Sequence, residues 1–214
     1  MEFVASGMIV GLGSGSTSDA FIQALGSAVK AGRFTDIKCV GSSINSERRA
    51  AHLGLVLTTF AENSCCSVYV DGADEVGPNL TLIKGLGGAL LREKICAQNS
   101  DAFVVIADAS KRVTKMGTRS PVPVEVTQFA HEATAKFLKS LGCNPILRQT
   151  SNGGPYITDN SNYIYDCHFN GIEDPAQLDT TMKARAGVVE TGLFVNIATV
   201  ALIADDEKVE TVSR

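Results

Sequence analysis

The segment that decides the fold runs from Ser67 to Ala97 and reads SVYVDGADEVGPNLTLIKGLGGALLREKICA. It begins with a β-branched and aromatic run, which is typical of a strand, and this run gives way abruptly to two acids, Asp71 and Asp74. A second apolar run stops at Lys84, before a cluster of glycines and a helical pattern that carries Glu93. In open α/β sheets, ligands bind beyond the carboxyl ends of the strands, which is where both polar clusters fall. We therefore expect the two aspartates, the lysine and the glutamate to converge.

Two parts of this segment resemble the signature sequences of the ribose-5-phosphate isomerase A family. These are DGADE, at residues 71–75, and KGLGGALLREK, at residues 84–94. The first pattern alone is weak, but its occurrence together with a Lys-Gly turn and a downstream Arg-Glu-Lys on a helix is specific. One residue departs from the family, because Leu86 stands where glycine is usual. We expect a negative φ at Leu86, since a branched side chain at positive φ is rare and strained.

Length and charge set limits on the class of protein. The chain has 214 residues and a mass of 22.5 kDa, which is enough for one domain or two modest ones. Its 19 basic residues are outnumbered by 23 acidic ones and are scattered, so no nucleic-acid partner is expected. No apolar run is long enough to span a bilayer, and we expect no membrane association.

The cysteines and the first residues indicate the compartment. The six cysteines lack paired metal-ligand spacing, and several lie within apolar runs, so we expect reduced thiols in a cytoplasmic protein. The opening sequence carries Glu2, lacks a basic leader and flows into a glycine loop, which argues against a signal peptide. The family normally has a helix before its first strand, whereas this chain begins at what looks like the last turn of that helix.

A second glycine-rich segment, GLGSGST at residues 11–17, follows an apolar strand at residues 8–12 and precedes a helix expected from about Ser18 to Ala31. Glycines let the backbone approach an anion, and hydroxyls and amides at a helix N-terminus donate hydrogen bonds to it. Alone, the pattern fits a capped strand-to-helix turn equally well, and it lacks the lysine of a Walker loop. The family resemblance implies that this loop receives a sugar phosphate.

The remaining pattern predicts the fold class. Strands at residues 37–40, 56–57 and 102–107 and a helix at 46–53 predict an α/β fold with a Rossmann-like, mainly parallel sheet and crossover helices. After the last of these strands, DASK resembles the D-x-S-K of the family, whose lysine, here Lys111, helps to hold substrate.

From Pro121 the pattern changes to that of a small inserted ferredoxin-like α+β domain. The β-α-β-β-α-β order comprises strands at 122–126, 145–148, a hairpin of 156–158 with 163–167, and 188–189, with helices at 129–141 and 175–184. The apolar run at 192–204 then returns to the first domain. We therefore predict a Rossmann-like catalytic domain at 1–120 and 192–214, with the ferredoxin-like domain at 121–191.

The resemblance implies an aldose–ketose isomerase of the non-oxidative pentose phosphate pathway, which interconverts D-ribose 5-phosphate and D-ribulose 5-phosphate through a cis-enediolate. This chemistry needs a base and a group that stabilises charge on oxygen, and Glu93 and Lys84 suit these roles. Asp71 would assist ring opening, Asp74 would hold sugar hydroxyls, and Glu75 is interpreted as a structural acid. The resemblance also implies a homodimer or homotetramer, and neither a metal nor another cofactor. The substrate-binding positions that it implies are Ser14, Gly15, Ser16, Thr17, Asp71, Gly72, Ala73, Asp74, Lys84, Gly85, Leu86, Gly87 and Lys111.

Two readings from other classes remain open at this point. The acids at 71, 74 and 75 could bind a divalent cation in a metal-assisted phosphatase or kinase-like enzyme, although no histidine or further carboxylate completes an evident coordination set. Alternatively, the chain could be a sugar-phosphate-sensing module with the same sheet architecture. Such a module would have no need of Glu93.

Overall fold

The computed structural model describes residues 1–214 and divides into two compact units. The first unit contains residues 1–72, 92–109 and 197–214, and the second contains 73–91 and 110–196. The chain therefore passes between the units four times. This division differs from the predicted one in that residues 73–91, 110–120 and 192–196 belong to the second unit. The physical reason is a three-stranded antiparallel sheet formed by β5 (Glu75–Val76), β6 (Leu82–Ile83) and β12 (Leu193–Phe194).

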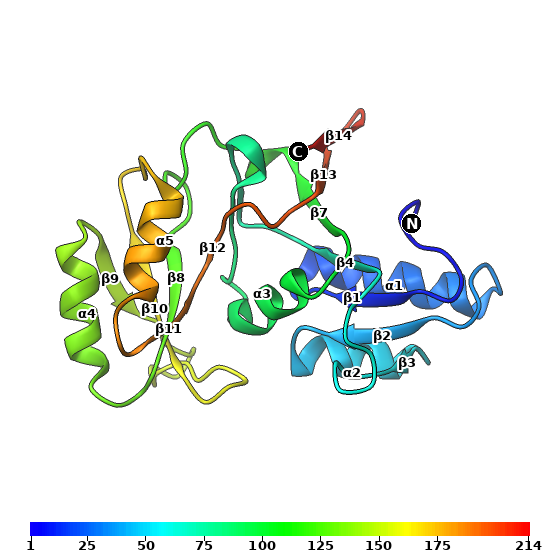
Figure 1. The fold of residues 1–214 in the computed structure, drawn as a ribbon, viewed down its shortest axis with the longest axis horizontal. Coiled ribbons are helices and arrows are strands. Elements are labelled where there is room, and N and C mark those ends of the chain that lie inside the picture. The colour runs from blue at the N-terminus through cyan, green and yellow to red at the C-terminus, as the bar shows by residue number, and fades with distance from the viewer. The chain divides into compact units, whose positions relative to one another are not determined.

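The first unit is built on a seven-stranded sheet in the order β14-β13-β7-β4-β1-β2-β3 (Figure 1). Every neighbouring pair is parallel except β13 and β14, so the predicted Rossmann-like sheet is confirmed. Its central strands are nearly continuous apolar runs, as expected of strands that are covered on both faces. The strands are β1 (Ile9–Leu12), β2 (Lys38–Gly41), β3 (Val56–Leu57), β4 (Val68–Asp71), β7 (Phe103–Asp108), β13 (Val200–Ala204) and β14 (Val209–Ser213).

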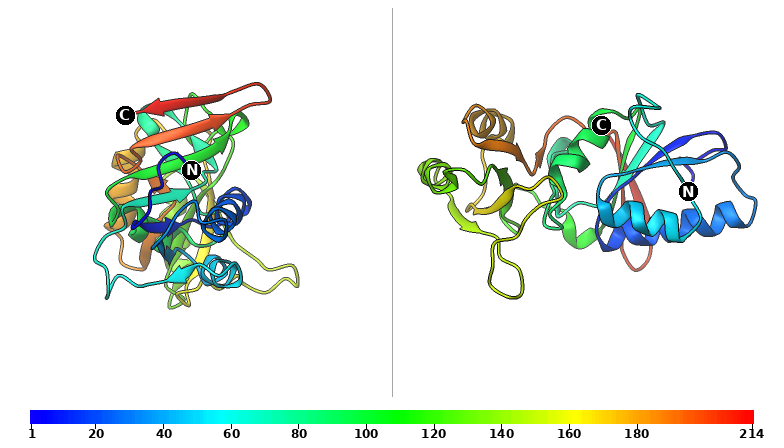
Figure 2. Two further views of the ribbon diagram at one scale, coloured as in Figure 1. Left: turned by 90° about the vertical axis from the view of Figure 1, so that its right-hand side faces the viewer. Right: turned by 90° about the horizontal axis from the view of Figure 1, so that it is seen from below.

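The helices of this unit connect successive strands. The crossovers between β1, β2 and β3 contain α1 (Ser16–Lys30) and α2 (Ile44–His52), which lie together on one face of the sheet (Figure 2). α1 buries Ile22 and Leu25 in the core beneath the sheet. The direction of strand addition reverses between β1 and β4, which makes this pair the switch point of the sheet. α3 (Leu90–Gln98) precedes β7 on the other arm.

The second unit contains a four-stranded antiparallel sheet in the order β11-β8-β10-β9, with α4 (His131–Ser140) and α5 (Pro175–Lys183) beside it (Figure 2). Its strands are β8 (Val122–Val126), β9 (Asn144–Leu147), β10 (Tyr163–His168) and β11 (Val188–Thr191). The chain order β8-α4-β9-β10-α5-β11 confirms the predicted ferredoxin-like topology.

One predicted strand of this unit is wrong. Residues 156–158 form no strand, and β10 pairs instead with β9. The segment is held by side chains, because the buried carboxylate of Glu125 accepts hydrogen bonds from the Thr158 hydroxyl at 2.9 Å and the Asn162 amide at 2.9 Å. Side-chain bonding of this kind satisfies the chain without a ladder partner.

Smaller differences concern short or polar elements. The second apolar run of the signature segment, residues 80–83, is a strand only over β6, because Pro78–Leu80 form a 3₁₀ turn, η1. β14 is exposed except at the half-buried Val212, and it carries too little apolar alternation to be predicted. All six cysteines are free thiols. None of the helices combines the length and apolar character needed to cross a membrane.

Candidate active site

The switch point between β1 and β4 positions the first part of the candidate site. The two strands are parallel neighbours, with Leu12 in register with Val70, so their carboxyl ends lie side by side. β1 continues into the loop at residues 13–17, and β4 ends at Asp71. Switch points of open α/β sheets are where such folds bind ligands.

Asp71 is fully buried, and both of its carboxylate oxygens accept hydrogen bonds. Oδ1 accepts from the backbone amides of Ser14 at 3.1 Å and Gly72 at 2.7 Å, and from the hydroxyl of Ser18 at 2.7 Å. Oδ2 accepts from the Tyr69 hydroxyl at 2.5 Å. Gly13 is required here, because a Cβ on it would lie 2.1 Å from Oδ1 of Asp71. The glycine loop and the first aspartate of DGADE therefore form one connected structure.

Tyr69 and Ser18 are functional neighbours that the sequence analysis did not identify. Burial raises the pKa of the Tyr69 hydroxyl well above its usual range, and the charges of Asp71 and Glu93 raise it further. The hydroxyl therefore stays protonated and donates a hydrogen bond to Asp71. In the sequence, Tyr69 lies between two other strand residues of a βαβ unit. Only the ability of its hydroxyl to form a hydrogen bond could have drawn attention to it.

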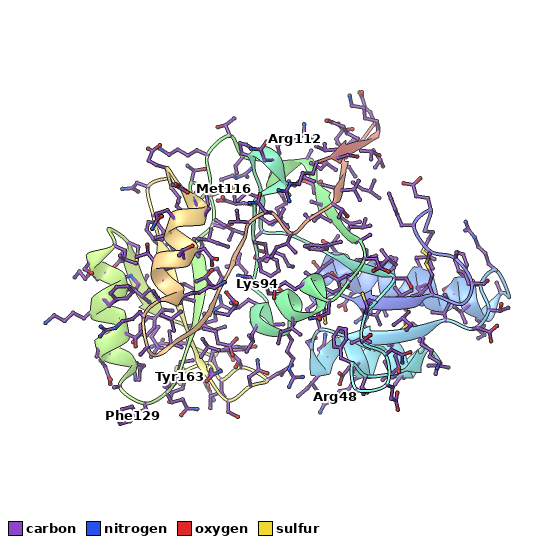
Figure 3. All side chains as sticks on the ribbon, viewed as in Figure 1. Arg48, Lys94, Arg112, Met116, Phe129 and Tyr163 are labelled. Carbon is purple, nitrogen blue, oxygen red and sulfur yellow. The ribbon has the colours of Figure 1, made fainter.

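Glu93 lies on α3 and is 2% exposed. The charges of Glu93 and Asp71 both raise the pKa of the Tyr69 hydroxyl, and all three residues belong to the first unit. Lys94, the next residue on α3 (labelled in Figure 3), is also buried. A helix that buries two consecutive charged residues is not the solvated helix face that an Arg-Glu-Lys triplet usually forms.

The N-terminus of α1 presents hydrogen-bond donors. Gly15 precedes the helix with a φ of 98°, and no side chain caps the first turn. Ser16 and Thr17 are exposed. Thr17 lies beside Gly72: a Cβ atom added to this glycine would be 3.6 Å from the Cβ of Thr17. Uncapped amides at a helix N-terminus, with hydroxyls around them, suit an anion such as a phosphate.

Ser14 differs from its neighbours in this loop, because its hydroxyl is already engaged within the protein. It donates to the Ser43 hydroxyl at 2.8 Å and lies 3.0 Å from that of Ser42. Ser43 in turn caps α2 by accepting from the Ser46 amide. The hydroxyl of Ser14 therefore ties the loop to the N-terminus of α2, and neither Ser42 nor Ser43 stood out in the sequence.

Lys84 belongs to the second unit, where it directly follows β6 and is 3% exposed. Its amide donates to the carbonyl of Gly192 at 2.9 Å, and its ammonium lies 5.6 Å from the centroid of the Phe194 ring. A cation over an aromatic face is stabilised by the ring quadrupole. Sequence reasoning identified the lysine but not its aromatic partner.

The turn after Lys84 is held by protein groups on both sides. Gly85 and Gly88 have φ of 105° and 85°, whereas Leu86 does not have a positive φ, so the expectation for this residue is confirmed. The amide of Leu86 donates to Oδ2 of Asp74 at 3.0 Å. The carbonyls of Gly85 and Leu86 both accept from Arg148 at 3.0 Å.

Glu75, which the sequence analysis interprets as a structural acid, binds only backbone amides through its carboxylate. It is fully buried, and its carboxylate accepts from the backbone amides of Gly117 at 2.7 Å, Arg119 at 2.8 Å and Ser120 at 2.7 Å. It thereby fixes the segment that leads into β8. Lys111 lies on a 3₁₀ turn, η2 (Ala109–Lys111), directly after β7, and is half-buried.

The candidate residues fall into two groups. The first unit holds Ser14, Gly15, Ser16, Thr17, Asp71, Gly72 and Glu93, and the second holds Ala73, Asp74, Lys84, Gly85, Leu86, Gly87 and Lys111. Asp71, Asp74, Glu93 and Lys111 each lie within two residues of a point where the chain passes between the units. No group of three or more His, Cys, Asp or Glu side chains is arranged to hold a metal ion.

Comparison with known proteins gives a consistent result. The family model described as ribose 5-phosphate isomerase A (phosphoriboisomerase A) matches residues 38–208. A relative from Synechococcus sp. (strain JA-3-3Ab), named ribose-5-phosphate isomerase A, is 45% identical over 209 residues, which cover 97% of this chain and 90% of the relative.

Two solved structures share the whole fold. A D-ribose-5-phosphate isomerase in complex with phospho-erythronic acid is 37% identical, with a TM-score of 0.97 over 100% of this chain and 93% of its own. The ribose 5-phosphate isomerase from Plasmodium falciparum is 39% identical, with a TM-score of 0.96 over the same shares of the two chains.

Proposed function

The chain belongs to the ribose 5-phosphate isomerase A family, and we infer from this membership that it interconverts D-ribose 5-phosphate and D-ribulose 5-phosphate. The reaction is an aldose–ketose isomerisation of the non-oxidative pentose phosphate pathway. The observation that carries this conclusion is the switch point of the sheet, where an uncapped helix N-terminus adjoins a buried aspartate. Such a pairing suits a ligand with a phosphate at one end and ionisable hydroxyls at the other.

The phosphate is assigned to the first turn of α1. Gly15, Ser16 and Thr17 are exposed residues, and their amides and the hydroxyls of the last two are donors at the positive end of the helix dipole. Ser14 contributes through the placement of the loop, since its hydroxyl is bonded to Ser43. Lys111 supplies the positive charge that a phosphate dianion needs.

The proton transfers are assigned to buried carboxylates. Asp71 handles the proton of the anomeric hydroxyl while the sugar ring opens. Glu93 then removes the proton from C2, which leaves a cis-enediolate, and returns it to C1 while the hydroxyl proton on O2 moves to O1. One base serving both carbons on the same face of the sugar is the simplest route between aldose and ketose.

Stabilisation of the negative charge on the enediolate oxygen is assigned to Lys84. Because its ammonium group is buried, it stabilises an oxyanion more strongly than an exposed ammonium group would. Asp74 and the backbone of residues 72–73 and 85–87 hold the sugar hydroxyls. Asp74 already binds the Leu86 amide, so it can link a hydroxyl of the sugar to the turn.

Turnover of ribose 5-phosphate in the presence of excess chelator tests the function directly. Formation of ribulose 5-phosphate at an undiminished rate is the expected result. Release of inorganic phosphate that requires Mg²⁺ would instead identify a metal-assisted phosphatase. Tight binding of ribose 5-phosphate with no turnover would identify a sensing module.

We also propose, from the family resemblance, that the enzyme works as a homodimer or homotetramer in the cytoplasm. The six free thiols, five of them buried, are in keeping with a reducing compartment. Light scattering of the purified protein measures the oligomer, and a mass of one chain of 22.5 kDa would contradict it. Fractionation of the source cells tests the compartment.

A further inference from the structure

Arg148 directly follows β9 and joins three parts of the second unit through its guanidinium group. Its Nε donates to Oδ2 of Asp166 at 2.9 Å and its Nη2 to Oδ1 of the same carboxylate at 2.5 Å. Its Nη1 donates to the carbonyls of Gly85 and Leu86, each at 3.0 Å. One side chain therefore ties the ferredoxin-like sheet to the turn that follows Lys84.

The guanidinium group is itself held rigidly. Its side chain is 12% exposed and that of Asp166 is 18% exposed, and their two parallel hydrogen bonds form the bidentate geometry that fixes both groups. The Tyr156 ring lies 5.8 Å from the guanidinium carbon. The backbone of Arg148 is fixed as well, because it donates to Ile164 at 2.8 Å and accepts from Tyr156 at 2.9 Å.

The turn has few other supports. On one side the Leu86 amide bonds to Asp74, and within the turn the Gly88 amide donates to the Gly85 carbonyl at 3.0 Å. Tyr156 closes the turn at Gly88, where any Cβ would lie 2.3 Å from the tyrosine hydroxyl oxygen. Arg148 is the one side chain that binds the carbonyls of both Gly85 and Leu86, in a turn that has two positive-φ glycines.

We propose that Arg148 is a positioning residue for the isomerisation. By fixing the carbonyls of Gly85 and Leu86 it sets the backbone that follows Lys84, and so it places the ammonium group assigned to the developing oxyanion. This inference rests on the proposed function of the Lys84 turn. It predicts that loss of Arg148 acts on the transition state more than on substrate binding, since it touches no group assigned to the phosphate.

Only arginine can make this arrangement. Two edges of its planar guanidinium group serve the carboxylate and the carbonyls at once, whereas lysine offers one compact charge. Arg148→Lys should therefore fail to restore activity although it keeps the charge. Arg148→Met removes the charge and keeps much of the apolar stem.

The experiment compares Arg148→Lys, Arg148→Met and Asp166→Asn with a control, Arg185→Met. Arg185 belongs to the same unit and lies 5.4 Å from the Phe137 ring centroid, so the control also removes an arginine over an aromatic ring, away from the turn. Kinetics are measured below the melting temperature of each variant. A displacement of about 1 Å at a reacting group can cost on the order of 100-fold in rate, and we expect kcat of both Arg148 variants to fall by about 10- to 100-fold, with KM within about threefold of wild type. Asp166→Asn loosens Arg148 without removing it, so its kcat should fall by about 3- to 10-fold. The kcat of Arg185→Met should not change.

Hydrogen exchange of the Leu86 and Gly88 amides gives a second readout in the same samples. The Leu86 amide is bonded to Asp74 and the Gly88 amide to the Gly85 carbonyl, so exchange faster by about tenfold or more is expected in the Arg148 variants and unchanged exchange in the control. A folded Arg148 variant with kcat within about twofold of wild type would overturn the inference. If Arg148→Met fails to fold, kcat and amide exchange of Arg148→Lys and Asp166→Asn decide whether the inference holds. Absence of wild-type turnover would defeat the proposed function, and amide exchange alone would then decide whether Arg148 holds the turn.

Discussion

The two glycine turns of the molecule differ in whether their polar groups are open to a ligand or bonded within the protein. The turn at residues 13–17 leaves the donors of its last residues open, since α1 has no side-chain cap and Ser16 and Thr17 are exposed. The turn at residues 85–88 has its polar groups taken up by the protein, with Asp74 on one side and Arg148 on the other. Similar compositions thus produce one turn that is ready to bind and one that is rigidly held.

A glycine-rich segment can act on a ligand in two ways, according to whether its backbone groups are open or already bonded. A turn whose amides face outward at a helix N-terminus supplies binding energy, which acts equally on substrate and transition state. A turn whose carbonyls and amides are mostly bonded within the protein fixes the position of the groups beside it, here Lys84. We therefore expect changes near the first turn to raise KM and changes near the second to lower kcat.

Of the changes near the turn at residues 85–88, Glu93→Gln should have the largest effect on kcat. Glu93 lies on α3, the helix that follows this turn. Glutamine keeps the shape of the side chain but cannot accept a proton, so kcat should fall by about 10²- to 10⁴-fold while binding of ribose 5-phosphate stays within a few-fold. Steady-state kinetics and calorimetry measure the two. The control is Glu62→Gln, an exposed acid, which should change neither. Turnover near that of wild type would move the base to another residue, with Asp71 the next candidate.

Thr17→Ala and Lys111→Ala test the open turn. Hydrogen bonds to a charged group are worth about 1.5 to 3 kcal/mol, so each change should raise KM by roughly 10- to 150-fold with little effect on kcat. Ser27→Ala, an exposed serine at the other end of α1, is the matched control. Free ribose turned over as well as its 5-phosphate would refute the phosphate assignment.

Glu75→Gln tests an acid of the same signature that touches neither turn. The amide group would place a donor against the Gly117 amide in a fully buried site, which should cost about 1 to 3 kcal/mol and lower the melting temperature by roughly 2 to 12 °C. Below the transition, kcat and KM should stay near those of wild type. A loss of kcat at constant stability would mean that Glu75 takes part in the reaction. Glu207→Gln, at an exposed position, should leave melting unchanged.

Leu86→Gly probes the backbone of the rigid turn. Because Leu86 does not have a positive φ, glycine only adds freedom to the unfolded chain and should cost about 0.5 to 1 kcal/mol. The melting temperature should drop by about 1 to 4 °C. Gly87→Ala is the reverse control, since a Cβ there meets nothing within 4 Å, and it should be neutral or slightly stabilising. A rise in melting temperature for Leu86→Gly would show that the turn prefers a left-handed residue.

Chelation should have no effect at all. Asp71 lies beside the open turn and Asp74 beside the rigid one, and both are proposed to act on sugar hydroxyls directly. Initial rates before and after exhaustive dialysis against a chelator measure this, with a metal-dependent enzyme treated alongside as a positive control. Activity that vanishes and returns with Mg²⁺ or Mn²⁺ would assign the two aspartates to a cation.

Much of the fold could be predicted from the sequence because its signals are local. β-branched runs placed β1, β2, β4 and β7 to within one or two residues, and the abrupt polar endings of the strands indicated where a site would form. The strands β5, β6 and β12 have two residues each, too few to show a period, and the boundaries of the units depend on their pairing.

The residues of the candidate site likewise divide into those that the sequence predicts and those that it does not. Asp71, Lys84 and Glu93 could be named from motif and resemblance, whereas their partners could not. Tyr69 reads as an ordinary strand residue until its hydroxyl is seen to meet Asp71, and Arg148 lies far along the chain from the carbonyls that it binds. Contacts between distant residues leave no trace in local periodicity.

The four passages of the chain between its units have a consequence for a protein emerging from the ribosome. β7 pairs with β4 on one side and with β13 on the other, but the whole segment 110–196 must be synthesised before β13 exists. Until then, β7 is an apolar edge strand with unpaired amides and carbonyls, which is a template for pairing with another nascent chain. Polypeptides that stop short of Val200 should therefore aggregate through β7, and maturation of the first unit must wait for its last strands.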